Sequence, residues 1–301
     1  MGPKQSMRSL IILIGNPAAR GASIKKFQSA SIFLRGKGFD TKTLLTEKSS
    51  DATHLASEAV REKPYAIIAA GGDGTINEVI NGMVKSDVPL AILPLGTTNV
   101  LAKELGIPEE FTRALNTAVS KPARTVSLGK IQWNLDTDSE GSRYFCHMAG
   151  IGFDGKAVRD VNESIKKKSG KAAYILSGIK NFLHYAPNQL FYNIDGKEYT
   201  GFSSITGKAS KYGGNFKITP DADLSEPYLY TCIFKGNKPR DLLRYVFKVM
   251  TGRLFDEGDI VYLKSTSVEI LGTAHIQIDG DYLGVTPAKI TVEKDALQII
   301  Y

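Results

Sequence analysis

The chain has 301 residues, of which 42% are hydrophobic and 23% charged, and its formal net charge is +7. This composition is close to the average of globular proteins, and the length suits two domains better than one. Apolar runs such as residues 10–14 are far shorter than the ~20 residues of a membrane-spanning helix, so a helical transmembrane protein is excluded and a cytoplasmic location is expected.

The first ~120 residues alternate apolar, strand-like runs with amphipathic, helix-like stretches, which is typical of a parallel sheet covered by helices. The pattern predicts strands at 10–14, 39–46, 65–70 and 89–93, and helices at 23–36, 51–62, 76–84 and 100–105. Loops after Ile14, Ala70 and Leu95 would then leave the carboxyl ends of parallel strands. Ligands of open α/β sheets bind at that edge.

The pattern changes after about Thr125, where short alternating runs with turn signals between them predict an antiparallel sandwich or barrel-like domain. The predicted strands are at 144–148, 190–194, 200–206, 228–234, 267–271, 275–278 and 289–292. Two helices are expected among them, at 171–185 and 239–254.

The stretch at 71–78, Gly-Gly-Asp-Gly-Thr-Ile-Asn-Glu, follows a predicted strand and opens a predicted helix. Adjacent glycines let the backbone approach a polyphosphate closely, and the helix start adds positive potential. Asp73 would hold Mg²⁺ or orient an attacking hydroxyl, because a carboxylate does not suit direct contact with phosphate. The alternative is a glycine-rich turn with a capping aspartate.

A second loop of the same construction, Pro-Leu-Gly-Thr-Thr-Asn at 94–99, carries two hydroxyls and an amide at a strand-to-helix turn. Two such loops side by side indicate a nucleotide-binding site. Neither the Gly-x-x-x-x-Gly-Lys-Ser/Thr phosphate loop nor a Gly-x-Gly-x-x-Gly after the first strand is present.

These segments occur in the order of a known family. The chain resembles the catalytic family of diacylglycerol, sphingosine and ceramide kinases, and especially the soluble bacterial diacylglycerol-kinase-like lipid kinases. The segments that carry the resemblance are 16–17, 46–47, 71–83, 93–105, 149–154, 170–174, 220–223 and 278–281.

The resemblance implies a phosphofructokinase-like, three-layer α/β nucleotide-binding domain (1–125), a β-sandwich-like antiparallel second domain (126–288) and a C-terminal segment (289–301) that returns to the first domain. It implies an active site in the cleft between the domains, with ATP and Mg²⁺ as cofactors. With the two loops read above, the predicted nucleotide-binding residues are Asn16, Thr46, Gly71, Gly72, Asp73, Gly74, Thr75, Ile76, Asn77, Glu78, Gly96, Thr97, Thr98 and Asn99.

The family's Ile-Asp-Gly-Glu segment, which carries the base, falls on residues 278–281 and places that role on Asp281. Aspartate is one methylene shorter than glutamate, so either the backbone compensates or Asp279 shares the role. Asp-Gly between alternating apolar residues also suits a plain hairpin turn.

The chain differs from the family at positions that would bind metal ions. Where many relatives carry further Mg²⁺-network aspartates, this chain has Val100 and Ser127, which leaves Asp73. The resemblance also implies a structural cation held by Asp223, Glu226 and the carbonyl of Tyr228, although a solvated acidic turn would look the same.

A membrane contact is expected at the helix predicted over 239–254. Arg240, Arg244 and Lys248 recur at four-residue spacing opposite apolar residues, a pattern that suits an anionic bilayer or a helix packed on its domain. The lysines at 166–171, ahead of an apolar stretch, are a second candidate.

The sequence therefore predicts an ATP-dependent lipid kinase that meets diacylglycerol or a related lipid at a membrane surface. The alternatives are an NAD kinase-like enzyme, which shares the Gly-Gly-Asp-Gly-Thr segment, and a catalytically weak lipid-binding or regulatory homologue. No nucleic-acid partner is expected, and a homodimer is left open.

Overall fold

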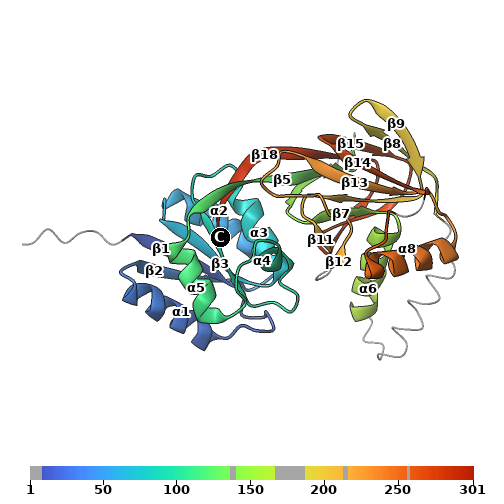
Figure 1. The fold of residues 1–301 in the computed structure, drawn as a ribbon. Helices are drawn as coiled ribbons and strands as arrows, with labels where there is room; N and C mark the ends of the chain where they lie inside the picture. The colour runs from blue at the N-terminus through green and yellow to red at the C-terminus, as the bar shows by residue number, and fades with distance from the viewer. Residues whose placement is uncertain (1–8, 136–139, 167–186, 213–215, 256–257) are drawn as a thin grey trace, which may run out of the picture. The chain divides into compact units, whose positions relative to one another are not determined.

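The computed structural model describes residues 9–135, 140–166, 187–212, 216–255 and 258–301 (Figure 1). The chain forms two compact units. Unit 1 comprises Met1–Val126 and Asp295–Tyr301, and unit 2 comprises Ser127–Lys294. The chain passes from one unit to the other within strands β5 (Ala123–Trp133) and β18 (Ala288–Ile300).

Unit 1 contains a parallel sheet with the strand order β2-β1-β3-β4-β18, to which β18 contributes its last residues. The other strands are β1 (Leu10–Gly15), β2 (Asp40–Leu45), β3 (Ala66–Gly71) and β4 (Leu90–Pro94). The helices are α1 (Ile24–Gly36), α2 (Asp51–Arg61), α3 (Asp73–Met83), α4 (Val100–Glu104) and α5 (Phe111–Ser120).

The helices cover the unit 1 sheet in two sets. Helices α1 and α5 contact each other, and their buried side chains share a core with the alternate strand residues Ile11, Leu13 and Ile68. Helices α2 and α3 pack together as the other set. A Cβ on Gly82 of α3 would lie 2.3 Å from the carbonyl oxygen of Thr53, so only glycine allows this close approach. The predicted three-layer α/β domain is confirmed.

Unit 2 is an antiparallel sandwich. One sheet has the order β14-β13-β10-β7-β16-β17, and the other contains β18, β15, β8 and β9 in that order, with β5 and β6 beside it. The strands are β6 (Gly141–Phe145), β7 (Met148–Ile151), β8 (Leu190–Ile194), β9 (Lys197–Gly201), β10 (Ser203–Gly207), β11 (Lys211–Tyr212), β12 (Phe216–Lys217), β13 (Leu229–Phe234), β14 (Ile260–Ser265), β15 (Ser267–Leu271), β16 (His275–Ile278) and β17 (Asp281–Val285).

The core of unit 2 lies between its two sheets. Ile151 and Ile276 from one sheet share a hydrophobic cluster with Tyr192 and Ile270 from the other. Helices α6 (Phe153–Lys166) and α8 (Pro239–Thr251) complete the described part of the unit, and Figure 1 shows both near strands β11 and β12. This arrangement confirms the predicted β-sandwich-like second domain.

Some elements differ from the sequence prediction. The strand expected at 144–148 is two strands, β6 and β7, which are separated at Cys146 and His147. Helices α5 and α6 were not predicted, and the helix predicted at 171–185 lies outside the described residues. Among the helices that the structure describes, none is both long and apolar enough to cross a membrane.

Candidate active site

The loops that follow β1, β3 and β4 are joined by backbone hydrogen bonds. The Asn16 amide donates to the carbonyl oxygen of Ala70 at 3.0 Å, and the Leu95 amide donates to that of Gly71 at 2.8 Å. The Gly21 amide in turn donates to the Leu95 carbonyl at 2.9 Å. The carboxyl ends of these three parallel strands therefore form one continuous edge of unit 1.

The two glycine loops touch through their backbones. A Cβ on Gly96 would lie 2.6 Å from the Cα of Gly72 and 2.7 Å from the Oδ1 of Asn99, so no side chain fits at position 96. A Cβ on Gly74, by contrast, would meet no atom within 4 Å. Gly72 is the N-cap of α3 and provides no side-chain acceptor, which leaves the first-turn N–H groups of α3 available to an anion.

Asn16 connects the first loop to α3. Its Nδ2 donates to the Oγ1 of Thr75 at 3.0 Å, and its Oδ1 accepts from the Ala18 amide at 2.9 Å. Thr46 follows β2 at the same edge, and its amide donates to the Gly15 carbonyl at 2.9 Å. Both predicted residues therefore lie in the loops of this edge.

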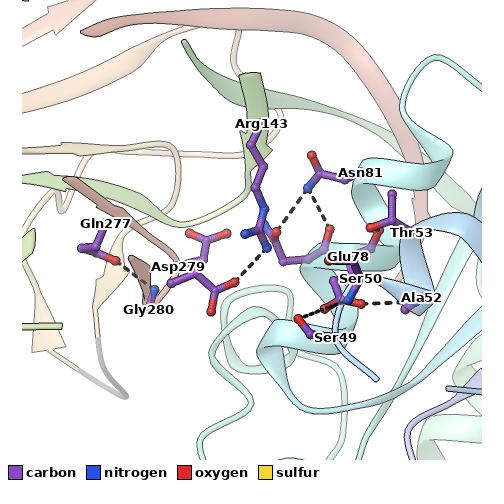
Figure 2. Close-up of polar contacts among 12 residues, drawn as sticks. Ser49, Ser50, Ala52, Thr53, Glu78, Asn81, Arg143, Gln277, Asp279 and Gly280 are labelled. Atoms are coloured by element: carbon purple, nitrogen blue, oxygen red, sulfur yellow. Dashed lines mark hydrogen bonds and ion pairs between the residues drawn. The ribbon is translucent and has the colours of Figure 1, made fainter. Parts of the chain in front are cut away.

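Three of the predicted nucleotide residues make contacts that hold the loops in place, and their binding of a nucleotide stays a prediction. The Glu78 carboxylate accepts from the amides of Ser50 and Ala52 at 3.0 and 3.2 Å (Figure 2) and so caps α2, whose own N-cap side chain makes no such bond. Asn99 adopts a left-handed conformation, and its Oδ1 accepts from the Gly96 amide at 2.9 Å.

Asn77 is the third of these residues, and only 1% of it is exposed. The Nδ2 of Asn81 donates to its backbone carbonyl and to its Oδ1, at 2.9 and 3.2 Å (Figure 2). Ile76 is likewise buried in the core, whereas Thr97 is exposed and Thr98 partly exposed. The accessible surface of the two loops thus includes glycine backbone and the side chains of Asp73, Thr97 and Thr98.

Asp73 lies partly exposed in the first turn of α3, where one carboxylate oxygen, Oδ1, accepts from the Leu101 amide at 3.3 Å. Magnesium is usually held by one or two carboxylates together with substrate phosphates. Val100 and Ser127 are both buried, and neither side chain carries a carboxylate. The Asp73 carboxylate is a donor of the type that Mg²⁺ accepts, and the metal site itself stays a prediction.

In unit 2, Asp279 and Gly280 form a two-residue hairpin between β16 and β17, both with positive φ values, of 48° and 91°. The Asp279 carboxylate spans the break between β6 and β7, because its oxygens accept from the amides of Cys146, His147 and Met148, each at 3.0 Å. The amide of Gly280 donates to the Oε1 of Gln277 at 2.9 Å (Figure 2). The hairpin interpretation is thus correct, and Asp279 also has a structural role.

Asp281, the first residue of β17, makes a different contact from that of Asp279. Its Oδ2 accepts from the Nη2 of Arg143 at 2.8 Å, and half of its side chain is exposed. A charge-assisted bond of this kind fixes the direction of a carboxylate. Three backbone amides hold the Asp279 carboxylate, whereas Asp281 is paired with one arginine and half of its side chain is exposed.

The predicted cation residues are engaged by lysines and by local donors. The Oδ1 of Asp223 accepts from the amide and hydroxyl of Ser225, both at 2.8 Å, and Glu226 pairs with Lys264 at 3.0 Å. The ammonium of Lys264 also lies 4.0 Å from the centre of the Tyr228 ring. Two oxygens of the predicted set are therefore already occupied.

Lys208, which the sequence analysis did not single out, lies buried in this region and donates to the carbonyl oxygen of Asp223. Burial lowers the pKa of its ammonium to about 8, although the carboxylates of Asp223 and Glu226 oppose that shift. Lys208 thus supplies a positive charge in the structure, and the cation site itself stays a prediction.

An apolar cavity of about 370 Å³ in unit 2 was also missed by the sequence analysis. Its walls come from β7, β10, β13, α6, α8 and the β11–β12 region, so its residues are scattered over a hundred positions of the sequence. The lining residues are Ile151, Phe153, Asp154, Ser203, Ser204, Ile205, Tyr212, Phe216, Ile218, Phe234, Leu242, Tyr245, Val246, Val249 and Met250.

Asp154 contributes the one carboxyl group to this lining. The Tyr212 hydroxyl and the Gln277 amide both donate to it. Burial raises the pKa of the Asp154 carboxyl, and those two hydrogen bonds oppose the shift. The motif at 149–154 was noted as part of the resemblance, but nothing in its spacing indicated a cavity.

Comparison with known proteins agrees with this architecture. Residues 10–131 match the diacylglycerol kinase catalytic domain, and residues 148–301 match the YegS C-terminal NAD kinase beta sandwich-like domain. The chain is 31% identical to a protein named diacylglycerol kinase from Bacillus subtilis, over 92% of this chain and 91% of that one. The chain belongs to the diacylglycerol kinase family. A diacylglycerol kinase from Staphylococcus aureus is 29% identical to the present chain. The matched region covers 94% of the present chain and 89% of the Staphylococcus protein.

Solved structures show the same fold. The crystal structure of a putative diacylglycerol kinase from Bacillus anthracis superposes on the present chain with a TM-score of 0.75 at 24% identity. The superposition covers 99% of the present chain and 98% of the Bacillus anthracis chain. A yeast NADH kinase solved with NADH is more distant, with a TM-score of 0.52 at 10% identity over 97% and 83% of the two chains. The family matches and the 31% identity to the Bacillus subtilis protein confirm the predicted family, whereas the similarity to the NADH kinase is a similarity of fold.

Proposed function

We propose that this chain transfers the γ-phosphoryl group of ATP to the hydroxyl of a lipid, with diacylglycerol as the first candidate acceptor. The main support for the proposal is the apolar cavity of unit 2. The same chain has, in unit 1, two glycine loops that contact each other through their backbones. A volume of about 370 Å³ lies in the usual range of ligand sites, and the mostly aliphatic and aromatic lining suits an acyl chain.

The loops of unit 1 would bind the triphosphate. Gly72, Gly74 and Gly96 let the backbone approach the phosphates, and the start of α3 provides N–H donors and a positive potential. The hydroxyls of Thr97 and Thr98 can donate to phosphate oxygens from the second loop. A Mg²⁺ ion on Asp73 would neutralise charge as it develops on the phosphates.

Asp281 would accept the proton of the lipid hydroxyl. Arg143 positions its carboxylate at 2.8 Å, and its exposed half leaves one oxygen accessible to a substrate. We assign Asp279 a positioning role, because three backbone amides bind its oxygens and hold the hairpin that presents Asp281.

The acceptor decides between this proposal and its rivals. The purified chain is incubated with Mg²⁺, labelled ATP and one acceptor at a time: diacylglycerol, monoacylglycerol, a sphingoid base, ceramide, a polyprenol or NAD. The proposal expects a labelled lipid, with diacylglycerol phosphorylated fastest. Label in NAD alone would assign the chain to the NAD kinases, and no labelled product from the folded chain would assign it to the catalytically weak homologues.

Substitution of Asp281 tests its proposed role as the general base. Asp281→Asn should lower kcat by about 10²- to 10⁴-fold while leaving ATP binding intact, because the proton acceptor is lost. Asp281→Glu keeps the carboxylate and should retain measurable turnover. The matched control is Asp87→Asn, which makes the same charge change at an exposed turn of unit 1. Equal activity of Asp281→Asn and the control would remove Asp281 from the proposed mechanism.

A further inference from the structure

Helix α8 has two different apolar faces. Leu242 and Tyr245 are buried against unit 2, as expected for a helix packed on a sheet. Leu243, Val246, Phe247 and Met250 recur at the i, i+3, i+4 and i+7 positions of the next face and are 59%, 48%, 64% and 63% exposed. The surface of a packed helix is ordinarily polar, so this exposed apolar face calls for an occupant.

The exposed face runs into the mouth of the cavity. Val246 and Met250 belong both to this face and to the cavity lining, and the exposed Phe216 of β12 lies on the same lining. Helix α8 is in contact with β12 in the structure (Figure 1). The exposed face of α8 and the lining of the cavity are therefore adjoining apolar surfaces that share two side chains.

Basic residues surround this face. Residues 235–255 contain six lysines and arginines and one acidic residue, Asp241, and one of the six, Arg244, is paired with Asp241 and Asp259. Arg240 lies on the flank of the apolar face, with 77% of its side chain exposed, and Lys235, Lys238 and Arg253 are also exposed. An apolar stripe bordered by cations matches a bilayer whose headgroups are anionic, since each cation near such a surface contributes about 1 kcal/mol.

We propose that α8 docks unit 2 on an anionic lipid bilayer, with Leu243, Val246, Phe247 and Met250 entering the interface and the flanking cations binding lipid phosphates. This docking would place the mouth of the cavity at the membrane surface, so that a lipid acceptor can enter without crossing water. The role as an entry point rests on the proposed lipid kinase function, whereas the docking itself can be measured without it.

The test is co-sedimentation of the full chain with vesicles of phosphatidylcholine alone or mixed with phosphatidylglycerol. The variant Leu243→Ser with Phe247→Ser changes two exposed side chains that do not line the cavity. We expect it to lower binding to the mixed vesicles by about tenfold or more. Arg240→Gln should lower that binding by about fivefold and leave binding to phosphatidylcholine unchanged. The matched control is Ile32→Ser, which removes an equally exposed side chain on α1 and should bind as the wild type does.

Activity assays separate the two proposals. On a water-soluble, short-chain diacylglycerol, the Leu243→Ser/Phe247→Ser variant should match the wild type, and on vesicle-borne diacylglycerol it should be slower by the factor lost in binding. Vesicle binding without phosphorylation of any lipid would reject the proposed function and keep the docking surface.

Three outcomes would overturn the docking proposal. The first is equal vesicle binding by the wild type and the Leu243→Ser/Phe247→Ser variant. The second is equal binding of the wild type to neutral and anionic vesicles. The third is a wild-type dimer that this variant converts to a monomer, since the apolar face would then be covered by a second copy of the chain.

Discussion

The buried Lys208 makes the stability of unit 2 depend on pH in an unusual direction. In the folded protein the pKa of this ammonium is about 8, against an ordinary value of 10.5. A lowered lysine pKa means that folding disfavours the charged form, so the unfolded chain binds more protons between these two values. Stability should therefore rise as the pH increases from 7 towards 10.5.

The size of this effect follows from the two pKa values. Below pH 8 the full cost of keeping Lys208 charged is about 3 kcal/mol, since each pKa unit corresponds to about 1.4 kcal/mol. By pH 9.5 the folded lysine is neutral and more than half of that cost is gone, so the wild type should gain about 2 kcal/mol over this interval. Tyrosines whose pKa is raised by burial, such as Tyr245, act in the opposite direction only above pH 10.

The assay is urea unfolding at several pH values from 7 to 9.5 for the wild type and for Lys208→Met. The difference between the two curves cancels every titration that the proteins share, and it should change by about 2 kcal/mol over the interval. Lys42→Met, which removes an exposed lysine paired with Glu62, should run parallel to the wild type. If Lys208→Met also runs parallel to the wild type, the buried lysine does not titrate near pH 8 and the reasoning fails.

Three further substitutions test the site. Gly96→Ala should force the two glycine loops apart, destabilise unit 1 by about 1–3 kcal/mol and weaken ATP binding measured by calorimetry, whereas Gly36→Ala, where a Cβ meets nothing within 4 Å, should do neither. Glu78→Gln weakens the cap of α2 and should lower the free energy of unfolding by about 1 kcal/mol, while Glu58→Gln at an exposed pair should change it little. Because burial raises the pKa of Asp154, this carboxyl should contribute a loss of stability as the pH rises from 4, and Asp154→Asn should remove that contribution in thermal melts. An unchanged acid slope in Asp154→Asn would contradict the last of these.

The sequence predicted the elements whose pattern is local. Strands β1 and β3 are buried on both faces and read as unbroken apolar runs, and β8, β15 and β16 were predicted with their observed bounds. The glycine loops could also be predicted, because a backbone that approaches a phosphate closely needs glycine.

Features that depend on distant partners could not be read in this way. The break between β6 and β7 depends on Asp279, more than 130 positions along the chain, which takes three amides out of the expected strand. The capping of α2 by Glu78 could not be predicted, because the amides that it binds belong to Ser50 and Ala52, at the start of another helix. In α8 the periodicity predicted the helix, but it could not tell which apolar face packs and which stays exposed.

Strand β18 has a consequence for biosynthesis. Its last residues complete the sheet of unit 1, where Ile299 pairs with Leu90, although the 168 residues of unit 2 lie between the two parts of unit 1. A ribosome adds about 5–20 residues per second, so the nascent unit 1 waits roughly 10–30 s for its final strand. During that interval β4 presents an unpaired edge, which can pair with a strand of another chain.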